Sequence, residues 1–318
     1  MRQLGLKKEN GIGELLKTYG VFLAFIILFV GNSIFTKNFL SMNTVQNILS
    51  QCTTTVLLGI GMTVVIATGG INISVGSVMA MSSMIAAKFI AEGHLVQGML
   101  LGLLAALFCG LLTGYVVIKF NIQPMIASLA MMFVLRGIAK LLNDGKNMNP
   151  RNKALNNFLY ETFAGIPVRT IIWLICVIIV AVLIYKTRFG ICIESYGDNN
   201  RATKIAGINT VAVITACYVI CNILACVAGF VEMGYSSIVD PGNMGSSKEM
   251  DAIAATVLGG TSIDGGKPHV WGTVVGAMVL QMITIMVNMN NVPASYAKII
   301  KAVIIVLAVY LQGNRKDD

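Results

Sequence analysis

The sequence has few charged residues, few prolines and almost no histidine. Only 12% of its 318 residues are charged, whereas an ordinary soluble domain carries about 25%. From residue 38 to residue 87 no charged side chain occurs at all. Because 56% of the residues are hydrophobic, a membrane protein with several crossings is indicated. No polar stretch is long enough to form a separate soluble domain.

The residues that carry most enzymatic chemistry are also scarce. His94 and His269 are the two histidines, and neither belongs to a His-Glu-x-x-His pattern. No Gly-x-Ser-x-Gly elbow occurs. The seven cysteines lie mostly in apolar runs without His or carboxylate partners, so we expect neither disulfides nor a metal site. We therefore predict no catalytic residue, no cofactor and no enzymatic activity of this chain.

The apolar runs predict an all-α fold with about ten membrane crossings, since one crossing needs roughly 20 apolar residues. Residues 38–52 are less apolar and are expected to lie in the membrane interface before the second crossing. Small residues at Gly98, Gly102, Gly110 and Gly114 predict close helix packing. The predicted crossings lie near residues 20–36, 53–70, 75–90, 95–118, 122–142, 170–186, 210–232, 251–263, 271–289 and 296–312.

A single membrane domain, residues 20–312, is expected between an N-terminal segment, 1–19, and a tail, 313–318. Ten crossings place both ends on one side of the membrane. The basic residues are almost equally divided between the two sides, so the positive-inside rule does not decide the orientation. The basic cluster before the first crossing favours cytoplasmic ends.

A polar, glycine-rich break interrupts the uncharged tract at residues 69–76. Lipid cannot satisfy free backbone amides, so such a break survives only where protein or water covers it. It is either part of a transport pathway or a tight turn between two helices at the membrane surface, and its lack of charge favours burial in protein. The predicted pathway or gate residues of this segment are Gly69, Gly70, Asn72, Ser74 and Gly76.

A second glycine-rich segment, residues 259–268, resembles a phosphate-binding loop but does not fit the pattern. Thr261 stands where the first glycine is required, and Pro268 follows the lysine. We predict no nucleotide binding and a surface turn, and we place Thr261 and Ser262 with the pathway. Residues 66–73 and 257–264 resemble each other, which is either a trace of a transporter repeat or chance.

Residues 197–207 predict a short helix outside the membrane. Asp198 or Asn199 is suited to cap its start, because both side chains accept hydrogen bonds from free amides. Gly207 is suited to its left-handed end. The helix is either a docking element or a solvated turn. The predicted docking residues are Gly197, Asp198, Asn199, Arg201, Ala202, Lys204 and Gly207.

The segment 121–125 predicts the start of another crossing, because Pro124 fits the first helical turn. Gln123 is polar at the edge of this crossing and is placed with the pathway. Arg136 and Lys140 lie near its other end, where snorkelling toward the headgroups is the favoured interpretation.

Together these motifs resemble the ribose-type monosaccharide permeases of ABC importers. Residues 67–77 are similar to the signature Gly-Gly-Ile-Asp-Leu-Ser-Val-Gly-Ser, residues 251–276 to a second signature, and residues 197–208 to the cytoplasmic coupling segment. The likeness covers nearly the whole chain from about residue 20. Asn72 stands where the family commonly has Asp, so a charge-dependent role of this position is lost while hydrogen bonding is preserved.

The resemblance implies a permease subunit in a bacterial cytoplasmic membrane, with residues 186–210 on the cytoplasmic side and coupled to an ATPase. The implied partners are a separate cytoplasmic ABC ATPase, an extracytoplasmic sugar-binding protein, and a second permease copy or paralogue, with no nucleic acid. Family members transport ribose, xylose, galactose, galactofuranose or autoinducer-2, and residues 291–302 are similar to galactofuranose-type permeases. The alternative function is an ion-coupled secondary transporter of a small polar solute.

Overall fold

The computed structural model describes residues 11–35, 39–290, 293, 295–297, 299–303 and 306. The predicted tail, residues 313–318, lies outside these residues, as do parts of the N-terminal segment and of the last crossing. The helices are α1 (Gly11–Phe35), α2 (Met42–Ile66), α3 (Val75–Ala91), α4 (Leu95–Lys119), α5 (Pro124–Leu141), α6 (Lys153–Tyr160), α7 (Val168–Lys186), α8 (Arg188–Asp198), α9 (Asn200–Ile205), α10 (Thr210–Ser236), α11 (Lys248–Leu258) and α12 (Val270–Met289).

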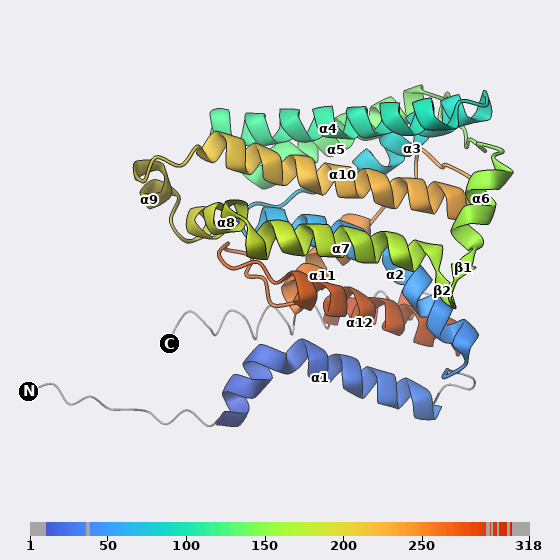
Figure 1. Ribbon diagram of the computed structural model, residues 1–318, viewed down its shortest axis with the longest axis horizontal. Helices are drawn as coiled ribbons and strands as arrows, with labels where there is room; N and C mark the ends of the chain where they lie inside the picture. Colours follow the sequence, from blue (N-terminus) through green and yellow to red (C-terminus); the bar gives the residue numbers. More distant parts are fainter. Residues whose placement is uncertain are drawn as a thin grey trace, which may run out of the picture.

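The long helices lie side by side along the long axis of the molecule (Figure 1). Helices α8 and α9 lie at one end of this bundle, and α6 lies at the opposite end. We call these the α9 end and the α6 end. Strands β1 (Thr162–Phe163) and β2 (Ile166–Pro167) form a small antiparallel hairpin at the α6 end, with Phe163 opposite Ile166. This hairpin is the exception to the predicted all-α fold among the described residues.

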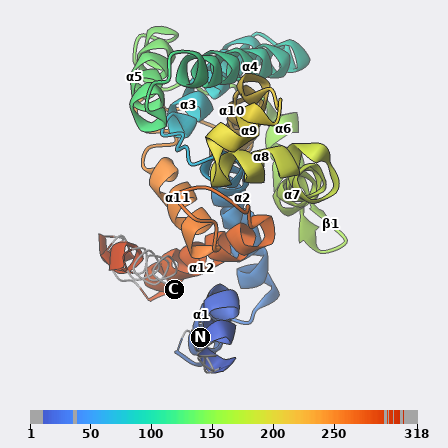
Figure 2. The same ribbon diagram turned by 90° about the vertical axis from the view of Figure 1, so that its left-hand side faces the viewer.

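Within the described residues, six helices are long and apolar enough to cross a membrane: α2, α4, α5, α7, α10 and α12. Two shorter apolar helices, Val21–Ile34 and α3, accompany them. The chain is therefore a multi-pass membrane protein. Viewed from the α9 end, α2 lies in the middle of the bundle, with α4 and α5 on one side and α1 on the other (Figure 2).

The start of α2 differs from the sequence-based expectation. Ser41 caps the helix by accepting a hydrogen bond from the amide of Thr44 at 3.2 Å, and the helix then runs unbroken from Met42. Ile48 and Cys52 are buried. The helix therefore begins eleven residues before the crossing predicted at 53–70, and its early part packs against α7, where the Trp173 indole donates to the Leu49 carbonyl at 3.2 Å.

Helix α4 packs closely on its neighbours through its glycines, as the sequence predicts. A β-carbon at Gly110 would lie 2.6 Å from the Cα of Val219 on α10, and one at Gly114 would lie 2.6 Å from the Cα of Thr215. Such distances leave no room for a side chain. The main chains of α4 and α10 are therefore in direct contact, and α10 is fixed in the core beside the break.

Candidate functional site

The break begins with a helix stop that requires glycine. The Gly69 amide donates to the Ile66 carbonyl at 2.8 Å, and the Gly70 amide donates to the Val65 carbonyl at 3.3 Å. Gly69 is left-handed, with φ 74°, which is the Schellman arrangement that closes a helix. Gly260 ends α11 in the same way, with φ 95° and a bond from the Thr261 amide to the Thr256 carbonyl. The internal echo in the sequence thus corresponds to one shared helix-ending geometry.

Asn72 fixes the middle of the break to the core. Its side chain is fully buried, and its amide nitrogen donates to the Asn222 Oδ1 at 2.9 Å. Its Oδ1 accepts from the Ser74 hydroxyl at 2.7 Å and from the Ser74 amide at 3.3 Å. Asn222 lies about halfway along α10. The break therefore enters the bundle to mid-depth, and α3 starts there at Val75.

A hydroxyl from a third helix forms hydrogen bonds with the main-chain groups of the break. The Ser128 hydroxyl, on α5, accepts from the Ile73 amide at 3.1 Å and lies 3.1 Å from the Ile71 carbonyl oxygen. Ser128 is fully buried. An unbonded backbone group is expensive in the membrane interior, so these bonds explain how an extended segment persists there.

A second broken segment enters from the opposite end. Helix α10 ends at Ser236 at the α6 end, and Val239 then pairs with Met148 as an isolated bridge. Helix α11 starts only at Lys248. Its 11 residues span about 16 Å at 1.5 Å per residue, or half of a hydrocarbon core of roughly 30 Å. The irregular residues 237–247 connect the end of α10 to the start of α11.

Arg136 on α5 supports this irregular segment. Its guanidinium donates to the Met244 carbonyl at 2.7 Å and to the Pro241 carbonyl at 3.3 Å. The favoured interpretation from the sequence, snorkelling toward the headgroups, is therefore wrong for Arg136. A guanidinium carries five donors in a rigid fork, which suits it to hold two carbonyls of one non-helical turn.

The two broken segments meet at a pair of glycines. A β-carbon on Gly76 would overlap the Gly245 carbonyl, and one on Gly245 would overlap the main chain of Gly76. Gly245 is left-handed, with φ 72°. The first turn of α3 therefore lies against the residues that precede α11. The Glu249 carboxylate lies beside the same glycine, 3.0 Å from where a β-carbon on Gly76 would be, a position that suits a negative charge near a helix start.

Three of the sequence motifs converge at the α9 end in a contact made of main chain. We define the glycine joint as Ala67, Gly69, Gly197, Gly265 and Gly266. The Gly266 amide donates to the Ala67 carbonyl at 2.9 Å. A β-carbon on Gly197 would overlap both of these groups, and one on Gly265 would lie 3.0 Å from the Gly69 nitrogen. The end of α8, the break and the loop after α11 therefore touch without intervening side chains.

Tyr196 precedes the joint on α8. Burial raises the pKa of its phenol above the ordinary value, so the ring is a neutral packing group there.

The structure also places Thr261 and Ser262 close to the joint, but their hydroxyls form hydrogen bonds within their own loop. The Thr261 hydroxyl accepts from the His269 amide at 3.0 Å, and the Ser262 hydroxyl accepts from the Asp264 amide at 3.3 Å.

The short helix α9 extends from the joint and has the predicted ends. Asn199 caps it, because its Oδ1 accepts from the Ala202 amide at 3.0 Å, whereas Asp198 is the last residue of α8. Gly207 closes it with φ 79°. Thr203 is its one buried residue, 3% exposed, and its hydroxyl donates to the Ser195 carbonyl at 2.7 Å. The side chains at the remaining predicted docking positions of α9, Arg201, Ala202 and Lys204, are exposed.

The predicted pathway residues do not all come together. Gly69, Gly70, Asn72, Ser74 and Gly76 share the break. Gln123 lies apart from them, with an exposed side chain before α5. Sequence reasoning missed Ser128 and Asn222 as partners of the break, Gly245 as its contact, and the role of Arg136 in the segment before α11. Asn222 carried a signal, because an amide stands alone in the apolar run of α10, and so did Arg136, as a charge within a predicted crossing, but Ser128 and Gly245 did not.

Comparisons with known proteins agree with this arrangement. A family model described as branched-chain amino acid transport system / permease component matches residues 44–309. The ribose import permease protein RbsC of Escherichia coli K12 is 34% identical over 302 residues, with 92% of this chain and 93% of that protein covered. The galactofuranose transporter permease protein YtfT of Escherichia coli K12 is 34% identical, with 85% and 79% covered.

The fructose import permease protein FruF of Bifidobacterium longum is also 34% identical, with 90% of this chain and 86% of that protein covered. Among solved structures, an inward-facing conformation of a metal-chelate type ABC transporter has a TM-score of 0.51 at 15% identity. The structural alignment covers 92% of this chain and 98% of the transporter chain. This likeness concerns the fold alone.

Proposed function

Because this chain belongs to the permease family of branched-chain amino acid transport systems, whose sugar-importing members are its relatives, we propose that it is the membrane subunit of an ATP-driven importer. The solute is a monosaccharide or a related small sugar. A separate ABC ATPase supplies the energy, and a separate extracytoplasmic binding protein delivers the sugar. The names of the relatives support the class of solute and leave ribose, galactofuranose and fructose as probes.

In this proposal the α9 end faces the cytoplasm of a bacterial cell and the α6 end faces outward. The chain crosses the inner membrane ten times. Two of these crossings are completed by irregular chain, before α3 and before α11, and the tenth includes residues 299–303. Both ends of the chain, residues 1–19 and 313–318, are then cytoplasmic, and residues 186–210 form the coupling loop.

The observation that carries the proposal is the exposed helix α9 attached to the glycine joint. Ile205 on α9 is 87% exposed, and its neighbours are small or basic, which suits a docking surface rather than a packed turn. Motion of α9 and α8 reaches Ala67, where the break starts, and Gly266, in the loop after α11. Both broken crossings therefore receive the same displacement when the ATPase closes on ATP.

Exposed polar residues at mid-depth support a second permease subunit, either an identical copy or a paralogue. Ser246 and Ser247 are exposed although they follow Gly245, which touches the start of α3 inside the bundle. Hydroxyls at this depth are unfavourable against lipid tails. A translocation pathway between two subunits, lined by this face of α11 and by the break, would cover them with water or sugar instead.

The decisive experiment is reconstitution into liposomes. With the ATPase and the binding protein, uptake of labelled sugar should require ATP inside and continue after ion gradients are collapsed. The orientation is checked with Ala202→Cys and a membrane-impermeant maleimide, which should react only after the membrane is opened at the ATPase side. Concentrative uptake by the permease alone, or labelling of Ala202→Cys from the outside of intact cells, contradicts the proposal.

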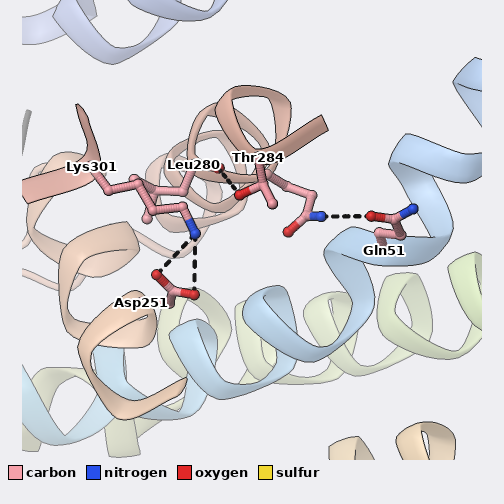
Figure 3. Close-up of polar contacts among 6 residues, drawn as sticks. Gln51, Asp251, Leu280, Thr284 and Lys301 are labelled. Carbon is pink, nitrogen blue, oxygen red and sulfur yellow. Dashed lines mark hydrogen bonds and ion pairs between the residues drawn. The ribbon is translucent and has the colours of Figure 1, made fainter. Parts of the chain in front are cut away.

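The second candidate is an ion-coupled secondary transporter, and one observation favours it. Lys301 and Asp251 form an ion pair at 3.2 Å between the last described helical segment and α11 (Figure 3). Ionisable groups within membrane segments often belong to ion pathways. This candidate requires uptake that follows a sodium or proton gradient without ATP, so the same liposomes decide between the two.

A further inference from the structure

A polar cavity of about 310 Å³ lies within the bundle in its α6 half. It is bounded by α2, α10, α11 and α12 and by the first turn of α7. None of the predicted pathway residues lines it. A water molecule occupies roughly 30 Å³ of liquid, so the cavity is large enough for about ten waters or one small solute. The residues that matter for its chemistry are Gln51, Thr54, Arg169, Glu232, Lys248 and Gln281.

Three charged side chains line this cavity, and no ion pair joins them. In the part of the chain that the structure describes, the ion pair is Lys301 with Asp251, and Asp251 follows the cavity-lining Lys248 by three residues on α11. Arg169 is only 8% exposed, and its Nε has no hydrogen-bond partner. Buried charges are normally paired or hydrogen-bonded. The buried Arg169, together with the half-buried Glu232 and Lys248 on the same cavity, therefore indicates a site for a polar ligand.

Arg169 is held in place without its hydrogen bonds being used. Its guanidinium carbon lies 4.0 Å from the centre of the Tyr235 ring and 5.5 Å from that of Tyr160. A cation over an aromatic face is stabilised through the ring quadrupole. The N–H groups of the guanidinium are thereby positioned in advance at the cavity wall, where they are available to a ligand.

Other residues of the cavity lining present acceptors as well as donors. The Glu232 carboxylate accepts from the Thr54 hydroxyl at 2.9 Å through one oxygen only. Gln281 donates to the Oε1 of Gln51 at 3.0 Å, an interaction that Figure 3 shows between α12 and Gln51. This bond leaves the Gln281 carbonyl oxygen as an acceptor and the Gln51 amide nitrogen as a donor.

This mixture selects one class of ligand. A simple anion would be repelled by the Glu232 carboxylate, and a simple cation would be repelled by Arg169 and Lys248. Neighbouring hydroxyl groups on a neutral ring both donate and accept, so they can satisfy all of these groups together. We propose that the cavity is a binding site for one neutral monosaccharide within each permease subunit. This inference rests on the proposed sugar import, and it assigns the permease a selectivity of its own besides that of the binding protein.

The chain provides its own reporter for a binding test. Of its two tryptophans, Trp173 is buried and donates to the carbonyl of Leu49, next to the cavity-lining Ser50, whereas Trp271 is exposed. The variant Trp271→Phe therefore leaves a single fluorophore beside the cavity. The full chain in lipid nanodiscs, without ATPase or binding protein, would be titrated with ribose, galactose and fructose, and with sulfate and gluconate as anionic probes.

The expected result is a saturable change in Trp173 fluorescence with at least one neutral sugar and none with the anions. Glu232→Gln and Lys248→Gln should each lower the affinity for that sugar by about tenfold or more, since each removes a charged hydrogen bond. Glu161→Gln and Lys153→Gln, exposed at the α6 end, should leave it unchanged. No sugar response, a response to anions alone, or equal affinity in all four variants overturns the inference.

Transport separates this inference from the proposed function. If Glu232→Gln and Lys248→Gln fail to fold, the titration of Trp271→Phe still decides the question. If the nanodiscs give no sugar response while the complete complex imports sugar with ATP, the cavity site is wrong and the importer stands. If the sugar binds but ATP drives no import, the importer is wrong and the binding site stands.

Discussion

The break at residues 69–76 and the helix α9 are both polar interruptions of an apolar chain, but they are built in opposite ways. Asn72 and Ser74 have no exposed surface, and their side chains bond within the protein. On α9, by contrast, Thr203 is the single buried anchor, and Ile205 is 87% exposed. The break thus holds a fixed geometry, whereas α9 presents a surface to be contacted. Substitutions in the break should reduce stability, and those on α9 should reduce coupling.

The largest expected effect is that of Gly245→Val. A β-branched residue at φ 72° is strained by about 1–3 kcal/mol, and its side chain would overlap Gly76 in addition. We expect little folded protein, measured as the monodisperse fraction in size-exclusion chromatography in detergent. Gly137→Val on α5, where a β-carbon meets open space, is the matched control. Equal yields of the two variants would show that the contact between the broken segments is dispensable.

A smaller loss of folding stability is expected for Asn72→Leu. It removes the donor to Asn222 and the acceptor for Ser74, and unsatisfied buried groups cost about 1–3 kcal/mol. Asn72→Asp should lose less folding stability than Asn72→Leu, because the Ser74 hydroxyl and amide can both donate to a carboxylate. The Nδ2 of Asn222, which lacks a partner, can then turn to donate to it as well. Thermal unfolding in detergent ranks the variants, and an aspartate less stable than the leucine would contradict this account.

A still smaller effect, dependent on pH, is expected at Asp240, which lies outside the candidate spans. Hydrogen bonds from the Asn243 side chain and from the amides of Gly242 and Asn243 hold the pKa of Asp240 below its ordinary value. A lowered folded-state pKa contributes stability above the unfolded pKa, near about 4, and loses it as pH falls through the folded value. Asp240→Asn should therefore lower the melting temperature by about 1–2 °C at pH 6. A difference that persists at pH 2.5 would contradict the assignment.

The smallest effect on stability, and a large one on transport, is expected for Ala202→Glu. An exposed substitution usually changes the free energy of unfolding by less than about 0.5 kcal/mol, but the added charge and bulk obstruct the proposed ATPase contact. Co-purification of the ATPase and ATP-driven uptake should both fall. Ala154→Glu, on exposed α6 at the opposite end, should leave both intact. Normal uptake by Ala202→Glu would remove the basis for the comparison.

The sequence predicts those parts of the molecule that depend on local chemistry. The stop at Gly69, the cap at Asn199 and the end at Gly207 are confirmed, because each depends on residues within one turn of the chain. The loop at 259–268 fails as a phosphate-binding loop for equally local reasons. Thr203 shows the limit of this reasoning, since the periodicity of a six-residue helix does not reveal which side chain turns inward to Ser195.

The sequence does not predict contacts between segments far apart in the chain. Ser128 is one hydroxyl among many on apolar helices, and Gly245 is one of 32 glycines, so neither is distinguishable before the fold is known. Residues 251–263 look like a short crossing, but the sequence does not show that α11 starts at Lys248 and ends at Leu258 after an irregular segment. The pairing of Gly76 with Gly245 depends on how two re-entrant segments pack, which is a property of the tertiary structure.

The composition of the glycine joint determines how this transporter can be re-engineered. At Gly197, main chain rests on main chain, so the fit depends on backbone position and hardly on the identity of nearby side chains. If α9 binds the ATPase as proposed, exchanging residues 198–207 for those of a related permease should change which ATPase is bound while the joint is kept. Inserting or deleting a single residue beside Gly197 should instead displace the contact with Ala67 and Gly266 and so uncouple ATP hydrolysis from transport.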